Sequence, residues 1–185
     1  MIVGYVGPKG AYAHEATERL VEKLGLIDVE EVALDSIHDV FYTLDKKEID
    51  SGVVPFKNTV LGQYPETVAH LRQYNPKTIG CLDLPIRLSL GVHPQTSPSL
   101  IQEIRSKENV LKECSVYLAN HYPLARLVEV ENYARAIREI MKERKVGVGA
   151  IGSLGLMENY GMRVLEREVG NSKDNITSFL YLKKR

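Results

Sequence analysis

The chain has no excess of either charge, few cysteines and no long apolar run, and each absence narrows its possible functions. Its 24 Lys and Arg residues balance 24 Asp and Glu residues, so it lacks the basic surplus that nucleic-acid binders usually carry. No apolar stretch is long enough to cross a bilayer, and the first ten residues lack the charged start and apolar run of a secretory signal. These absences favour a cytoplasmic enzyme, with neither nucleic acid nor membrane as a partner.

Metal-binding and redox spacings are also missing. Cys81 and Cys114 lie far apart without a CxxC motif, so we expect both to be reduced core residues. Four histidines lack the partner spacing of a metal site, and we expect them to be surface or packing residues: His14, His38, His70 and His121. The sequence therefore predicts no metal site.

Short β-branched runs alternate with amphipathic helical stretches along the whole chain. Strands are expected at residues 2–6, 29–34, 51–56, 78–84, 86–92, 125–130, 146–151, 162–167 and 176–182. Helices are expected at residues 11–24, 39–44, from Pro65 onward, 99–105, 110–120, 133–142 and 153–159. This β-α-β alternation indicates an α/β protein with a mostly parallel sheet.

Three short polar segments could carry chemistry. Residues 7–10 (Gly-Pro-Lys-Gly) join a strand to a helix, where backbone N–H groups can face an anion, although an ordinary connector looks the same. Lys57, Asn58 and Thr59 follow the strand at 51–56 and carry an ammonium, an amide and a hydroxyl group. In a doubly wound sheet, the residues just past the carboxyl ends of the strands line the ligand crevice. Asn58 or Thr59 could instead cap a helix. Residues 174–179 enter the last strand, and could be merely a strand after a turn.

Taken in order, these segments resemble the motifs of the prephenate dehydratase family. Residues 7–10 resemble its Gly-Pro-x-Gly opening, residues 54–59 its Val-Pro-x-Glu-Asn-Ser segment, and residues 175–179 its Asn-x-Thr-Arg-Phe segment. Shorter matches lie at residues 84–86, 106–114 and 150–153. The resemblance covers essentially the whole chain.

The resemblance implies two Rossmann-like α/β lobes with a cleft between them, similar to the type 2 periplasmic-binding-protein fold. We expect lobe 1 to comprise residues 1–76 plus 177–185, and lobe 2 residues 77–176. Crossover segments at 75–84 and 169–177 would act as the hinge on which the lobes close. The stretch around Asn58 should face the stretch around Thr177 across one ligand-sized gap.

The resemblance also implies an activity. Family members are lyases of phenylalanine biosynthesis that convert prephenate, a dicarboxylate, to phenylpyruvate with loss of CO2 and water, and they use no metal or organic cofactor. The expected catalytic residues are Thr177, as an exposed cleft hydroxyl, with Asn58 and Thr59. The expected substrate-binding residues are Lys57, Asn175, Ser178, Phe179, Gly10, Ala11 and Tyr12.

At four positions the chain departs from the family pattern: Lys57 replaces Glu, Thr59 replaces Ser, Lys107 replaces His and Ser178 replaces Arg. The arginine is expected to bind a substrate carboxylate through a planar fork of donors, which a serine cannot replace. Lys57 is the first candidate for the missing cation. Arg87 and Lys107 are weaker candidates, and solvent-facing charge explains them better.

Two other functions remain open. One is a relative that decarboxylates prephenate but keeps the ring hydroxyl, giving a non-aromatic product. The other is a non-catalytic small-molecule binding protein of the same fold. By resemblance we expect a homodimer or homotetramer, and no phenylalanine-sensing ACT domain, because the chain ends three residues after Leu182.

Overall fold

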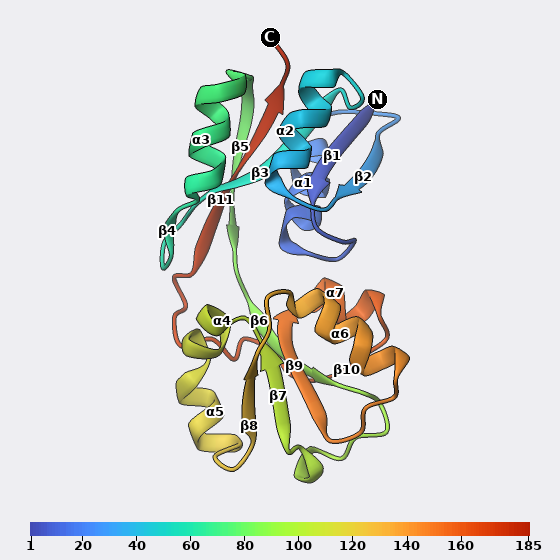
Figure 1. Ribbon diagram of the computed structural model, residues 1–185, viewed down its shortest axis with the longest axis vertical. Helices are drawn as coiled ribbons and strands as arrows, with labels where there is room; N and C mark the ends of the chain where they lie inside the picture. Colours follow the sequence, from blue (N-terminus) through green and yellow to red (C-terminus); the bar gives the residue numbers. More distant parts are fainter. The chain divides into compact units, whose positions relative to one another are not determined.

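The chain, described over residues 1–185 by a computed structural model, forms two α/β units (Figure 1). Unit 1 contains Met1–Ile86 and Asp174–Arg185, and unit 2 contains Arg87–Lys173. The boundaries therefore lie at residues 86/87 and 173/174, and not at 76/77 and 176/177 as the sequence suggested. The reason is that strand β5 (Lys77–Pro85) pairs with strand β11 (Ile176–Lys183) along its length, which places β5 in the sheet of unit 1.

The sheet of unit 1 is mixed, with strand order β2-β1-β3-β11-β5. Its other strands are β1 (Ile2–Val6), β2 (Glu30–Leu34), β3 (Ser51–Asn58) and the short β4 (Gly62–Gln63), which pairs with β3. Strand β1 is parallel to β2 and β3, whereas β11 is antiparallel to both β3 and β5. The loops that leave β1 and β3 therefore lie at the same sheet edge as the start of β11.

Helices cover both faces of this sheet: α1 (Tyr12–Lys23) one face, and α2 (Ile37–Lys46) with α3 (Pro65–Tyr74) the other (Figure 1). Side chains alternate between faces along each strand. On β11, Phe179 and Tyr181 pack in the core with α1, while Leu180 and Leu182 pack in the core with α2. Both faces of β11 are therefore buried, which explains its nearly continuous apolar sequence.

Local signals set the helix ends of unit 1. The Ser36 hydroxyl accepts a hydrogen bond from the Asp39 N–H at the start of α2, a standard N-cap. Pro65 occupies the first turn of α3, where its missing N–H costs nothing. Lys47 and Asn75 end α2 and α3 in the left-handed conformation.

Unit 2 is built on a second mixed sheet, with strand order β10-β6-β9-β7-β8. Its strands are β6 (Leu88–Val92), β7 (Glu103–Ser106), β8 (Arg126–Glu129), β9 (Val148–Ser153) and β10 (Arg163–Glu166). Its helices are the 3-10 turn η1 (Pro98–Leu100), α4 (Glu108–Glu113), α5 (Ser115–His121), α6 (Tyr133–Lys142) and α7 (Leu154–Asn159). The α/β architecture expected from the sequence is confirmed.

Two helix predictions in unit 2 were wrong. Residues 99–105 form η1 followed by strand β7, because β7 pairs with β8 and β9 and buries Ile104 between them. The helix expected at 110–120 is broken at Cys114 into α4 and α5. In the first case, tertiary pairing overrides a helical pattern.

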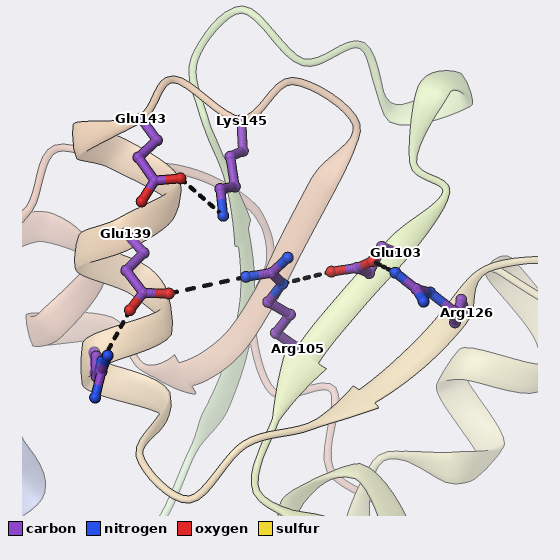
Figure 2. Close-up of polar contacts among 7 residues, drawn as sticks. Glu103, Arg105, Arg126, Glu139, Glu143 and Lys145 are labelled. Carbon is purple, nitrogen blue, oxygen red and sulfur yellow. Dashed lines mark hydrogen bonds and ion pairs between the residues drawn. The ribbon is translucent and has the colours of Figure 1, made fainter.

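An ion-pair network ties β7, β8 and α6 together in unit 2 (Figure 2). Glu103, which is buried, accepts hydrogen bonds from Arg126 and from Arg105, whose Nε lies 2.5 Å from Glu103 Oε1. Arg105 also lies 4.0 Å from Glu139 on α6. Burial by itself would raise the pKa of Glu103, but the hydrogen bonds from the two arginines outweigh it and hold that pKa below its usual value.

No helix in the chain has the length and apolar character needed to span a bilayer.

Candidate active site

Asn58, the last residue of β3, is the centre of a buried polar cluster. Asn58 is only 3% exposed. Its Nδ2 donates to Asn175 Oδ1 at 2.7 Å and to Thr177 Oγ1 at 2.9 Å. Its Oδ1 accepts from the N–H groups of Val60 and Leu61, at 2.8 Å each. Both amide hydrogens are therefore used within the chain, and the orientation of the amide is determined.

The cluster joins residues that lie more than one hundred positions apart in the sequence. Asn58 and Thr177 are register partners on the antiparallel strands β3 and β11. They contact each other directly, so the expectation of a ligand-sized gap between them was wrong. Thr177 is also only 3% exposed, and not the exposed hydroxyl that the sequence suggested.

Thr59 is hydrogen-bonded to the backbone of the residues that lead into β11. Its hydroxyl donates to the Asp174 carbonyl at 2.6 Å and accepts from the Ile176 N–H at 2.9 Å. Its own N–H donates to the Ile176 carbonyl at 2.9 Å. Because its hydroxyl both donates and accepts within the backbone, Thr59 holds Asn175 and Thr177 in place beside Asn58.

Asn175 keeps a donor for an outside group. Its Oδ1 accepts from Asn58 and its carbonyl accepts from the Ile86 N–H, but no hydrogen bond within the chain uses its Nδ2. An amide N–H2 group at the carboxyl edge of the sheet is suited to a carboxylate or carbonyl oxygen.

Lys57, Ser178 and Asp83 lie side by side on the three neighbouring strands β3, β11 and β5. Ser178 pairs in register with Lys57 on β3 and with Asp83 on β5. The Ser178 hydroxyl donates to Asp83 Oδ1 at 2.5 Å. Lys57 is exposed and forms no ion pair. The hydroxyl of Ser178 is therefore committed to a carboxylate, whereas the nearby ammonium group of Lys57 is available.

Gly10, Ala11 and Tyr12 lie at the same edge of the sheet, after β1. Gly7 and Gly10 both have a φ of +89°, which favours glycine and turns the chain into α1. Ala11 is the N-cap of α1, and Tyr12 packs against the core beneath that helix. Phe179 is buried in the same core, so Tyr12 and Phe179 support the sheet edge from within.

Tyr64 is a site residue that the sequence did not reveal. It precedes α3, its N–H donates to the Phe56 carbonyl, and its hydroxyl is hydrogen-bonded to the Thr177 side chain. Burial raises the pKa of Tyr64, and the hydrogen bond with Thr177 only partly opposes that rise. Tyr64 therefore stays neutral near pH 7 and keeps its O–H. Its one sequence signal, an aromatic residue before a helix, is also typical of a core position.

The two weaker cation candidates have partners within unit 2. Arg87 Nη1 donates to the Lys173 carbonyl at 2.8 Å, and its Nε lies 3.7 Å from Glu168. Lys107 is the N-cap of α4, and its ammonium lies 6.0 Å from the centre of the Tyr133 ring.

Comparison with known proteins agrees with the motif order. The sequence matches the family model for prephenate dehydratase over residues 3–185. It is 30% identical to a bifunctional chorismate mutase/prephenate dehydratase of Aquifex aeolicus, over 99% of this chain and 49% of that protein. It is 29% identical to a prephenate dehydratase of Methanocaldococcus jannaschii, over 98% of this chain and 64% of that protein. The chain thus spans about half to two thirds of the length of these relatives.

Solved structures show the same fold. Prephenate dehydratase from Arthrobacter aurescens, solved in complex with L-Phe, superposes with a TM-score of 0.88 at 20% identity, covering 100% of this chain and 61% of that chain. A putative methionine-binding lipoprotein from Bacillus subtilis superposes with a TM-score of 0.53 at 11% identity, covering 100% of this chain and 83% of that chain. The expected likeness to both kinds of protein is confirmed. With its family match over nearly the full sequence, the chain belongs to the prephenate dehydratase family.

Proposed function

We propose that the chain converts prephenate to phenylpyruvate, CO2 and water. In this reaction the bond to the ring carboxylate breaks, its electron pair enters the ring, and the ring hydroxyl leaves as water after gaining one proton. The observation that carries the proposal is the buried cluster of Asn58, Asn175 and Thr177, which joins two family motifs at the carboxyl edge of the unit 1 sheet.

Thr177 is the proposed catalytic residue. A hydroxyl group has two acceptor lone pairs and one donor hydrogen. Asn58 donates to one lone pair of Thr177, and the Thr177 O–H turns from the Tyr64 oxygen to donate to the departing hydroxyl group. Such a preorganised donor stabilises the negative charge that develops on the leaving oxygen. Asn58, Tyr64 and Thr59 act through Thr177 and are positioning residues.

Lys57 and Asn175 are the proposed carboxylate anchors. Lys57 lies directly across from Ser178, the position where the family pattern has arginine, and its ammonium has no other partner. Asn175, whose Oδ1 accepts from Asn58, supplies a neutral donor through its free Nδ2. The Ser178 hydroxyl donates to Asp83, so it has no hydrogen left for a substrate carboxylate. Gly10, Ala11 and Tyr12 shape the neighbouring loop.

One observation favours a second candidate, a decarboxylase that keeps the ring hydroxyl. Where the family motif has a positively charged arginine, this chain has the neutral Ser178, whose hydroxyl donates to the Asp83 carboxylate on β5. Such a change can alter which bond breaks. Around either active site, we propose a cytoplasmic homodimer or homotetramer that serves phenylalanine biosynthesis if the product is aromatic.

Product analysis separates these functions. Purified protein is incubated with prephenate at neutral pH beside a protein-free control, and the products are identified by chromatography and mass spectrometry. Phenylpyruvate supports the dehydratase, and a dihydro-hydroxyphenylpyruvate supports the decarboxylase. Saturable binding of prephenate without any product would instead indicate a binding protein and contradict both enzymatic functions.

A further inference from the structure

A second cluster of polar side chains lies in unit 1 outside the proposed active site. His14 and Glu18 are one turn apart on α1, and Glu31 comes from the neighbouring strand β2. His14 Nε2 lies 3.2 Å from Glu31 Oε2, and His14 Nδ1 lies 3.7 Å from Glu18 Oε2. One potential ligand atom from each of the three residues lies within 4.8 Å of the other two.

The imidazole of His14 is held firmly, while one carboxylate can move. His14 is only 7% exposed, and its ring centre lies 5.0 Å from that of the buried Tyr5. The Glu31 side chain is 22% exposed, and that of Glu18 is 58% exposed. The cluster thus combines two largely fixed groups with a third at the surface that can adjust.

We propose that His14, Glu18 and Glu31 bind a divalent transition-metal cation of the zinc type. Imidazole nitrogen and carboxylate oxygen are both zinc ligands, and water would complete a tetrahedron. Zinc–ligand bonds of about 2.1 Å place tetrahedral ligands roughly 3.4 Å apart, and one nitrogen of His14 binds the ion, so the exposed Glu18 carboxylate must move from beside Nδ1 to join Glu31 beside Nε2 by changing rotamer. Magnesium, which prefers oxygen ligands and retains water, is a poor match for the imidazole.

The bound ion would cross-link two elements of unit 1. Strand β2 is at the edge of the sheet and pairs only with β1, while α1 begins at the Gly7–Gly10 loop. An ion held by both would fasten β2 to α1 and so stabilise the folded state by mass action. The role is structural and independent of the proposed reaction.

Metal binding is tested on the full chain without a polyhistidine tag, after treatment with a chelator that is then removed. Zinc sulfate is titrated by calorimetry, and thermal unfolding is followed with and without zinc, with magnesium chloride as a comparison. We expect one zinc ion per chain, a higher Tm with zinc and no comparable response to magnesium. His14→Gln, Glu18→Gln and Glu31→Gln should each weaken zinc binding by at least the roughly tenfold that loss of a supporting group causes.

Two matched variants control for nonspecific binding. Glu15→Gln removes a carboxylate from the same helix, where Glu15 pairs with Arg19 at 2.7 Å, and should leave zinc binding intact. His70→Gln removes the histidine of another helical pair, 3.8 Å from Glu66, and should also leave it intact.

Three results would overturn the proposal: no zinc binding by the wild-type chain, loss of binding in His70→Gln, or undiminished binding in both Glu18→Gln and Glu31→Gln. The last two variants change exposed or half-buried groups, so they remain informative if His14→Gln fails to fold.

Discussion

At the scale of single residues, the arrangement around Thr177 determines what its hydroxyl can do. Thr177→Ala should lower kcat by about 10²–10⁴, the range for loss of a positioned proton donor. Because Thr177 is buried and accepts from Asn58, the same change should also cost about 1 kcal/mol of stability. Thr177→Ser, which keeps the hydroxyl, should retain most activity.

Thr78→Ala, at an exposed position on β5, is the matched control for steady-state kinetics and thermal unfolding. A Thr177→Ala variant as active as wild type would remove Thr177 from the mechanism.

Tyr64 is expected to act by orienting Thr177. Tyr64→Phe keeps the ring but removes the hydroxyl hydrogen-bonded to Thr177. We expect kcat to fall about three- to tenfold, equivalent to one hydrogen bond of roughly 0.5–1.5 kcal/mol, with little change in KM. Tyr74→Phe, at the end of the same helix, should change neither constant. If both variants behave alike, the Tyr64 hydroxyl has no part in the reaction.

Lys57 is expected to act in substrate binding. Lys57→Met keeps a long side chain but removes the charge across from Ser178. Loss of a charge-assisted hydrogen bond, about 1.5–3 kcal/mol, should raise KM by about tenfold or more while kcat changes less. Lys77→Met, an exposed lysine at the far end of β5, is the control in the same assay. An unchanged KM in Lys57→Met would exclude its anchoring role.

At the scale of elements, the ion-pair network of unit 2 should make the pairing of β7 and β8 sensitive to pH. The pKa of Glu103 is lower in the folded state than the roughly 4.3 of a free glutamate. Its stabilising effect is therefore present above that value and is lost as pH falls through the folded-state pKa. Glu103→Gln should lower the unfolding free energy by about 1–3 kcal/mol at pH 7, and by less near pH 3.

Denaturant unfolding at the two pH values measures this difference. Glu108→Gln is the control, because Glu108 pairs only on the surface with Lys112, and exposed pairs contribute little. A Glu103→Gln effect that is the same at both pH values would show that the carboxylate charge is not involved.

At the scale of the whole molecule, each unit has its own sheet, and the chain passes between the units only at residues 86/87 and 173/174. Leu20→Ala creates a cavity in the fully buried core beneath α1, at a cost of about 2–5 kcal/mol. Hydrogen exchange should then lose protection mainly in β1, β3 and β11, with the strands of unit 2 little changed.

Ile137→Ala, at a fully buried position on α6, should have the reverse effect. Equal loss of protection in both units from either variant would show that they unfold as one cooperative block.

The sequence alone determined the features that depend on near neighbours. Helix periodicity and capping residues placed most elements within a few residues, as in α6 at Tyr133–Lys142 and β1 at Ile2–Val6. Motif order also grouped Asn58, Thr59, Asn175 and Thr177, which hydrogen bonds bring together at the end of β3 and the start of β11. The element predictions succeeded because propensity and side-chain period are local properties.

Only the tertiary structure decided which distant groups meet. Asn58 reaches Thr177 across 119 positions, Ser178 gives its hydroxyl to Asp83 across 95, and Tyr64 reaches Thr177 from a different element. Strand β7 likewise exists because β8 and β9 pair with it. Such contacts depend on strand order and register, which local propensity does not encode.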